Sequence, residues 1–366
     1  MASDRGHELR LERITKRFGD SVAVRDIDLT IAAGELVALL GPSGCGKSTL
    51  LRIISGFMPQ SEGRVLFDGQ SVDHLASNRR GVGIVFQNYA LFPHMTVRQN
   101  VAYGLEVQRQ PKGRIAARVD EMLTLVKMTE FAERFPRQLS GGQQQRIALA
   151  RCLAVDPKIL LLDEPFGALD KNLRLDMQLE VKRLQREYGI TTVLVTHDQE
   201  EALSMADRVA VMSRGRIEQV SSPIEIYDQP HTLFVNQFVG TTNTFDAVVE
   251  RGEGQRVSVR LSSGELVNGV AAEPLAPGSA VTISIRPEQL RLVAADAANG
   301  VAGDIAAALP LGPIVLYDIR RRDGTAFKVS TPRNGGDPIL GAGQAVFAAP
   351  TAQAQYRIYS AVRPSP

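Results

Sequence analysis

The sequence contains no tryptophan and only two cysteines among 366 residues. Two cysteines cannot build the disulfide framework that holds small secreted domains together, so we expect a reducing compartment. Charge of neither sign is in excess, because 42 basic side chains are balanced by 40 acidic ones. This balance gives no support for a protein that binds nucleic acid by neutralising phosphates, and we expect no nucleic-acid partner.

Long apolar runs are also missing. The first ten residues, MASDRGHELR, hold no apolar core of the kind that a secretory signal needs, so we expect the chain to start in the cytosol. The most apolar later stretch, 305–317, is too short to span a bilayer and is interrupted by Pro310 and Pro313. The 44% hydrophobic content is enough for ordinary buried cores, and the length favours two domains.

From residue 36 to about 212, short apolar runs alternate with helical patterns, which is typical of parallel βαβ units and an α/β fold. Three runs end at polar or glycine-rich residues: 36–40 before a glycine loop, 159–162 before Asp163 and Glu164, and 192–196 before His197. Ligands of open parallel sheets lie beyond the carboxyl ends of the strands. We therefore expect these three ends to meet in one crevice.

The remaining patterns predict helices and a second domain. Helical periodicity over 115–128 and 143–155 predicts an α-helical subdomain at about 89–155, and a further helix is expected to end at Gly189. Beyond about residue 240 the pattern changes to the alternation of strands. We expect one domain over 1–240 and an all-β domain over 241–366.

The stretch GPSGCGKST at 41–49 follows a predicted strand and opens a predicted helix. In that context its glycines let backbone N–H groups turn toward a β-phosphate, Lys47 reaches the β and γ oxygens, and the Ser48 hydroxyl can bind Mg²⁺. The alternative is a flexible turn with a solvated lysine. The predicted phosphate-binding residues are Gly41, Pro42, Ser43, Gly44, Cys45, Gly46, Lys47, Ser48 and Thr49.

Acidic and polar residues at the other strand ends predict catalysis. Asp163 is a candidate Mg²⁺ ligand, and Glu164 is placed to polarise a water that attacks the γ-phosphate. Either acid could instead cap a neighbouring helix. Gln87 is a candidate for metal or water contact, and His197 is a candidate because it ends a third strand of the same sheet.

A second glycine-rich helix start lies well after the first. Ser140, Gly141, Gly142 and Gln143 directly precede a helical run, and the exposed N–H groups of a helix start can bind an anion. The residues alone do not say why one chain needs two such sites.

Taken in order, these motifs resemble the ATP-binding subunits of ABC transporters over roughly residues 8–240. Phe18 stands where that family places an aromatic ring that stacks on adenine, and a core phenylalanine is the alternative. The motifs and their counterparts are 41–49 (Walker A), Gln87 (Q-loop), 139–143 (signature), 159–165 (Walker B), 168–170 (D-loop) and His197 (switch histidine).

The resemblance implies a P-loop ATPase that uses ATP and Mg²⁺, with Glu164, His197 and Gln87 as its catalytic residues and Ser48, Gln87 and Asp163 at the metal. It also implies that two ATPase domains pair head-to-tail, so that the stretch 140–143 of one contacts nucleotide held by the other. The partner is a second copy or a paralogous subunit.

The domain after the core resembles the OB-like β modules that regulate importer ATPases, through 284–288 and 311–317. This favours an importer ATPase over an exporter or a soluble ABC ATPase. It implies membrane permease subunits, a solute-binding protein acting indirectly, and a peripheral place on the cytoplasmic face of the bacterial inner membrane. Segments 169–178 and 233–243 resemble the spermidine/putrescine branch, while iron(III), sugar, opine and phosphonate importers remain alternatives.

Three further features of the sequence bear on its predicted function. Residues 89–97 are expected to dock a permease helix, or else Tyr89 and Phe92 fill the core of the helical subdomain. The run 320–322 is expected to be a solvated set of arginines. Gly167 departs from the family pattern, which often has serine there.

Overall fold

The computed structural model describes residues 6–167, 169–293, 300–334 and 338–361, and the chain forms two compact units, Met1–Pro230 and His231–Pro366. The division falls before the expected boundary at residue 240. It does so because helix α8 (Leu233–Phe238) bonds to the second unit, where the Asn236 side-chain amide donates to the Tyr359 hydroxyl at 3.1 Å. No helix among the described residues is long and apolar enough to cross a membrane.

The first unit is built on a six-stranded sheet in the order β10-β9-β3-β8-β7-β6. Its strands are parallel except β10, which runs antiparallel to β9. Every residue of β3 and β8 is buried, as expected for central parallel strands covered on both faces. The strands are β3 (Leu36–Leu40), β6 (Val82–Val85), β7 (Ile159–Asp163), β8 (Thr191–Thr196), β9 (Arg208–Ser213) and β10 (Arg216–Ser221).

An antiparallel sheet in the order β2-β1-β4-β5 completes the strands of this unit. One apolar core joins it to the larger sheet through the buried face of α1, which begins at Lys47. The elements are β1 (Leu9–Phe18), β2 (Ser21–Ile31), α1 (Lys47–Ile54), β4 (Glu62–Phe67) and β5 (Gln70–Ser71).

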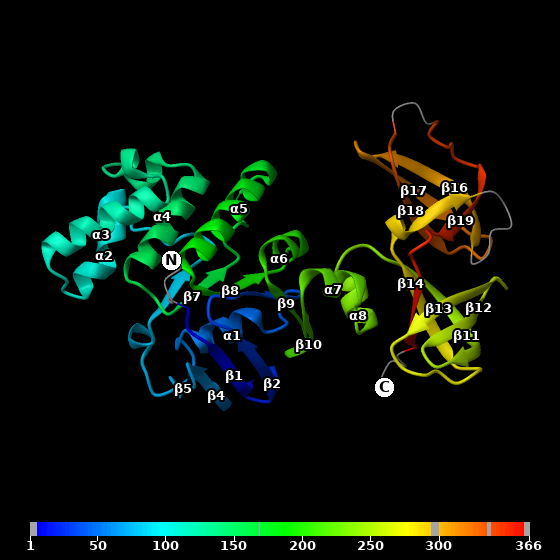
Figure 1. Ribbon diagram of the computed structural model, residues 1–366, viewed down its shortest axis with the longest axis horizontal. Helices are drawn as coiled ribbons and strands as arrows, with labels where there is room; N and C mark the ends of the chain where they lie inside the picture. Colours follow the sequence, from blue (N-terminus) through cyan, green and yellow to red (C-terminus); the bar gives the residue numbers. More distant parts are fainter. Residues whose placement is uncertain (1–5, 168, 294–299, 335–337, 362–366) are drawn as a thin grey trace. The chain divides into compact units, whose positions relative to one another are not determined.

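Helices α2, α3 and α4 pack against one another and form the expected helical subdomain (Figure 1). Helix α5 ends at Gly189, whose φ of 67° is the left-handed conformation that glycine adopts most easily, so the predicted stop is confirmed. The helices of the unit are α2 (Val97–Val107), α3 (Lys112–Leu125), α4 (Gly141–Ala154), α5 (Lys171–Tyr188), α6 (Gln199–Met205) and α7 (Pro223–Asp228), with short 3₁₀ turns at Ser77–Arg79, Thr129–Phe131 and Pro136–Gln138.

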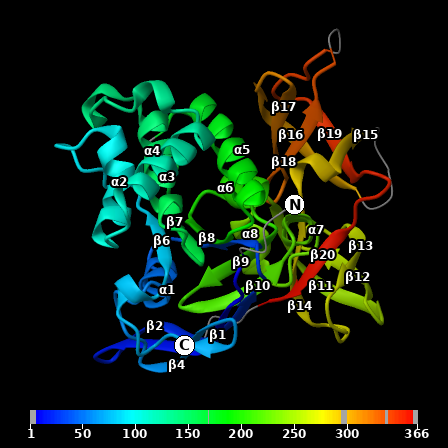
Figure 2. The ribbon, with the colours of Figure 1, turned by 60° about the vertical axis from the view of Figure 1, so that its left-hand side comes forward.

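The second unit confirms the all-β, OB-like expectation. Five strands close a barrel in the order β11-β12-β13-β20-β14, and Figure 2 shows β20, near the end of the chain, beside β13 and β14. A five-stranded sheet, β15-β19-β16-β17-β18, shares its apolar core. The bounds are β11 (Asn243–Glu253), β12 (Arg256–Leu261), β13 (Leu266–Ala271), β14 (Ala280–Ile285), a 3₁₀ turn (Pro287–Gln289), β15 (Leu290–Val293), β16 (Val301–Pro310), β17 (Ile314–Arg320), β18 (Ala326–Pro332), β19 (Ala345–Pro350) and β20 (Tyr356–Ser360).

The arginine run 320–322 differs from the expectation. Arg321 is buried, with a side chain only 2% exposed, and its guanidinium pairs with Glu265 at 3.1 Å and Asp323 at 3.2 Å. It also lies over the Phe245 ring, 5.4 Å from the ring centroid. The expected solvated run is wrong for its middle member, because the alternation of a β-strand continued through Ile319 turns every second side chain inward.

Candidate active site

The carboxyl ends of the central strands lie side by side, as expected. Leu40 at the end of β3 pairs with Thr196 at the end of β8, and Asp163 at the end of β7 pairs with Val195. Since β6 also runs parallel to β7, the segment that carries Gln87 leaves the sheet at the same edge. The glycine loop, the acidic pair and His197 therefore come from one edge of one sheet.

The glycine loop has a shape that requires glycine. Gly46 has a φ of 106°, and a Cβ added there would lie 2.7 Å from the Ala23 carbonyl oxygen and 3.0 Å from a Val24 methyl carbon. Gly46 is the N-cap of α1, and among the described residues no side chain caps that helix start. The first N–H groups of α1 are thus not taken by a capping side chain, which leaves them able to bind an anion.

Lys47 is held at this loop. Its side chain is buried, and its ammonium donates to the carbonyl oxygens of Gly41 at 2.6 Å and Pro42 at 3.0 Å. Cys45 is buried beside it, and a Cβ on Gly41 would come within 2.7 Å of the Cys45 sulfur. The Cys45 side chain therefore packs inside the loop, so any contact with phosphate comes from its backbone.

The other loop residues surround this lysine. Ser43, Gly44 and Ser48 are exposed, whereas Pro42 and Thr49 are half-buried. An exposed hydroxyl at Ser48, next to the buried ammonium, is available for a metal ion that also touches phosphate.

Two carboxylates lie at the end of β7, Asp163 as its last residue and Glu164 directly after it. Burial and the neighbouring Glu164 raise the pKa of Asp163 above its ordinary value, while Arg52 and Lys47 act in the opposite direction. A half-buried acid beside a second acid favours a bound cation, because a cation offsets both the lost hydration and the repulsion. Mg²⁺ prefers oxygen ligands, and the Asp163 carboxylate and the Ser48 hydroxyl are oxygen donors of the kind that fit it.

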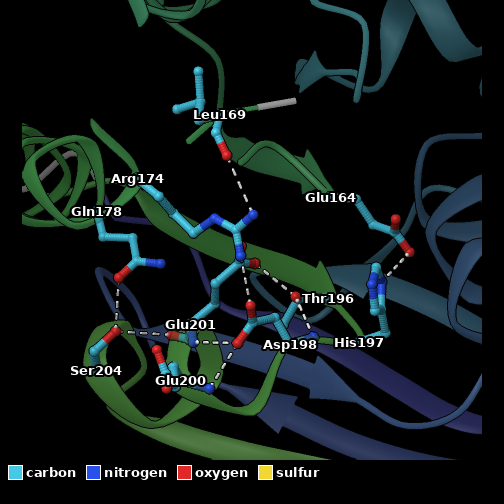
Figure 3. Close-up of polar contacts among 10 residues, drawn as sticks. All are labelled: Glu164, Leu169, Arg174, Gln178, Thr196, His197, Asp198, Glu200, Glu201 and Ser204. Atoms are coloured by element: carbon cyan, nitrogen blue, oxygen red, sulfur yellow. Dashed lines mark hydrogen bonds and ion pairs between the residues drawn. The ribbon is translucent and has the colours of Figure 1, made fainter. Parts of the chain in front are cut away.

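Glu164 contacts His197. A Glu164 carboxylate oxygen lies 3.1 Å from His197 Nδ1, and the two side chains are 26% and 60% exposed (Figure 3). Glu164 has a φ of 47°, and its N–H donates to the Val195 carbonyl at 2.9 Å. This uncommon backbone conformation turns the acid away from the apolar strand and toward the histidine.

Gln87 lies beside the same acidic loop. A Cβ on Gly167 would be 3.3 Å from the Gln87 side-chain nitrogen, and the Gly167 N–H donates to the Glu164 carbonyl at 3.3 Å. A serine at this position would therefore press on the Gln87 amide. Gly167 thus gives the Gln87 amide more room than a residue with a side chain would.

The second glycine-rich stretch forms the start of α4. The Ser140 hydroxyl accepts from the Gln143 N–H at 3.4 Å, and the Gln143 side chain accepts from the Ser140 N–H at 2.9 Å, which makes a capping box. Gly141 and Gly142 let this helix start approach two leucines closely. Their added Cβ atoms would lie 3.2 Å from side chains of Leu169 and Leu173.

Comparison with known proteins fits this geometry. The family described as ABC transporter matches residues 24–167, and the TOBE domain matches residues 283–356. The spermidine/putrescine import ATP-binding protein PotA of Rubrobacter xylanophilus is 51% identical over 318 residues, which cover 86% of this chain and 84% of that protein. The chain belongs to the ABC transporter family. The putrescine transport ATP-binding protein PotG of Escherichia coli is 46% identical, with 86% and 85% covered.

Two solved structures resemble the ABC transporter core of this chain. The ATP-binding cassette MJ0796, in a dimeric post-hydrolysis state bound to ADP and Pi, is 34% identical, with a TM-score of 0.52 over 59% of this chain and 98% of its own. The protein cbiO1 of Clostridium perfringens, part of the transporter complex cbiONQ, is 33% identical, with a TM-score of 0.57 over 60% and 90%. Nucleotide use and the core fold follow from this kinship, so the chain is an ABC-type ATPase.

Phe18 is not a core residue. It ends β1 with 49% of its surface exposed, and the Lys16 ammonium lies 5.3 Å from its ring centroid. An exposed ring can stack on a base, whereas a buried one cannot.

The two aromatics expected at a permease contact differ from each other. Tyr89 is buried, which supports the alternative that it fills the core, and burial raises its pKa. Phe92 is half-buried, with its ring 4.5 Å from that of Tyr103, which is exposed. Of the D-loop, Leu169 and Asp170 are described and Ala168 lies outside the described residues.

Sequence reasoning missed the residues that hold the segment around His197. Asp198 caps α6 by accepting from the N–H groups of Glu200 at 2.8 Å and Glu201 at 3.3 Å. The Thr196 hydroxyl donates to the Glu201 carboxylate at 2.6 Å. An acid two residues after a predicted strand and just before an acidic helical turn is a signal that could have located this cap.

Proposed function

We propose that this chain hydrolyses ATP to power the import of polyamines through a separate membrane permease. The observation that carries the catalytic part is the contact between Glu164 and His197 at 3.1 Å, at the same sheet edge as the buried Lys47. The transported solute is proposed from kinship, since the relatives compared above are named for spermidine/putrescine import and for putrescine transport.

Each residue of the site has a separate role in the proposed reaction. Lys47 and the N–H groups at the start of α1 hold the β- and γ-phosphates. Glu164 takes a proton from the attacking water, whose oxygen bonds to the γ-phosphorus as the bond to the departing ADP breaks, and His197 contacts the γ-phosphate. Gln87 orients water or metal from beside Gly167. A bound Mg²⁺, held by Ser48 and Asp163, supplies charge stabilisation of the transferred phosphoryl group.

A second ATPase domain completes each site in this proposal. The capped start of α4, at Ser140, Gly141, Gly142 and Gln143, then contacts the γ-phosphate held by the partner's glycine loop. The partner is another copy of this chain or a paralogue. Hydrolysis removes these contacts, so the pair opens and drives the permease.

We also propose where the chain is located and which proteins act with it. The chain binds permease subunits at the cytoplasmic face of the bacterial inner membrane, and a solute-binding protein delivers the solute from the other side. The β unit, which matches the TOBE domain, regulates hydrolysis.

The test is reconstitution in proteoliposomes with the permease subunits and solute-binding protein of a spermidine/putrescine importer. Addition of spermidine or putrescine should stimulate phosphate release and drive uptake of the labelled polyamine. Stimulation by iron(III), a sugar, an opine or a phosphonate instead would reassign the solute and keep the importer. ATP hydrolysis with no uptake of any solute would favour a soluble, non-transport ATPase.

A further inference from the structure

Arg174 bridges two segments that are distant in the sequence. It lies in the first turns of α5, where its guanidinium donates to an Asp198 carboxylate oxygen at 2.8 Å and to the Leu169 carbonyl oxygen at 3.3 Å (Figure 3). We propose that Arg174 is a positioning residue that links the start of the signature helix α4 to the pairing of His197 with Glu164. This inference rests on the proposed function, because it concerns how the hydrolytic site responds to a partner.

On one side of Arg174, the segment around His197 is held at both flanking residues. Asp198 uses one carboxylate oxygen to cap α6 and the other to bind Arg174. The Asp198 N–H donates to the Thr196 hydroxyl at 2.9 Å. A displacement of Asp198 therefore moves the backbone on which His197 stands, and with it the 3.1 Å contact to Glu164.

On the other side, the first turn of α5 is packed against the signature. Leu169 and Leu173 lie so close to Gly141 and Gly142 that an added Cβ on either glycine would be 3.2 Å from a leucine carbon. Asp170 caps α5 by accepting from the Leu173 N–H at 3.0 Å, which keeps this turn rigid. A partner's nucleotide that shifts the start of α4 must therefore shift the turn that carries Arg174.

The contacts of Arg174 suit positioning better than fold stability. Its side chain is 31% exposed and that of Asp198 is 25% exposed, and ion pairs reached by solvent contribute little to stability. Removal of the Arg174 contacts should then lower kcat and leave the melting temperature almost unchanged. A double-mutant cycle measures the coupling between Arg174 and Asp198 directly.

The experiment compares R174M, R174K, D198N and the double variant R174M/D198N in the full chain assembled with its permease. The matched control is R183M, since Arg183 lies on the same helix and pairs with Glu187 at the surface. The readouts are kcat, KM for ATP and Tm. We expect R174M to lower kcat by about tenfold or more with KM and Tm close to those of R183M, because small misplacements of reacting groups are costly.

R174K should recover part of the rate, and the double variant should be no slower than the slower single variant. Equal kcat for R174M and R183M, or rate losses that multiply in the double variant, would overturn the inference. If both R174M and R174K bound ATP poorly and had a clearly lower Tm, the inference would also be overturned, because Arg174 would then be needed for the stability of the fold. A wild-type assembly that hydrolyses no ATP would instead refute the proposed function.

Discussion

Replacing Glu164 with glutamine tests the centre of the mechanism. The glutamine is almost isosteric and keeps an oxygen that can accept from His197 Nδ1, which lies 3.1 Å from the carboxylate in the wild type. The site is not deeply buried, since the Glu164 side chain is 26% exposed, so the free energy of unfolding should change by less than about 1 kcal/mol. What the variant loses is the proton acceptor.

The expected loss of rate follows from that role. A positioned general base contributes about 10²- to 10⁴-fold, so kcat should fall by that factor, which raises the activation free energy by about 3 to 5 kcal/mol. ATP affinity should be unchanged, because Lys47 and the glycine loop are intact. The trapped triphosphate should also hold two ATPase domains together. The assays are phosphate release, ATP titration and light scattering with and without ATP.

A matched control is E200Q, which removes an exposed acid close to His197 in the sequence and should leave kcat within about twofold of wild type. Wild-type turnover by E164Q would refute the base role of Glu164. An ATP-loaded E164Q that stays monomeric in the presence of its partner subunits would refute the shared-site reasoning.

Three further substitutions and one labelling experiment test other parts of the structure. Lys47→Ala should weaken ATP binding by about 100-fold in calorimetry, since it removes the buried ammonium, and unchanged affinity would reject the phosphate cradle. Ser140→Arg in one member of a tagged mixed dimer should inactivate the site anchored by the other member's Lys47, and damage confined to the mutated member's own site would exclude crossed sites. Arg321→Met should lower the free energy of unfolding of the β unit by about 2 to 4 kcal/mol in urea titration, because it leaves Glu265 without its buried cation, and a change below about 0.5 kcal/mol would mean a solvated arginine. Burial raises the pKa of the Cys152 thiol to about 11, so at pH 8 only about one molecule in a thousand carries the thiolate, and mass spectrometry should find alkylation of Cys152 only after unfolding.

Much of the candidate site could be predicted from local pattern. The glycine loop at 41–49 depends on spacing within nine consecutive residues, and in the structure it begins directly after β3 and continues into the first turn of α1. The stop at Gly189 and the alternation beyond residue 240 are equally local, because helix ends and strand faces are set by neighbouring residues. The expected meeting of strand ends also held, since parallel strands share one carboxyl edge.

Other features could not be predicted from local sequence patterns. No local pattern pairs Arg174 with Asp198 or buries Arg321 between Glu265 and Asp323, because each contact joins separate elements. The unit boundary before α8 likewise depends on Asn236 meeting Tyr359, far along the chain.

The sequence by itself determined which residues can bind phosphate and activate water, since those abilities belong to side-chain chemistry and to short-range spacing. Only the tertiary structure decided that Glu164 meets His197, that Gly141 and Gly142 rest on Leu169 and Leu173, and that Arg174 stands between these groups. The physical reason is that sheet pairing and core packing choose which distant segments touch, and the free energy of those choices is spread over the whole core.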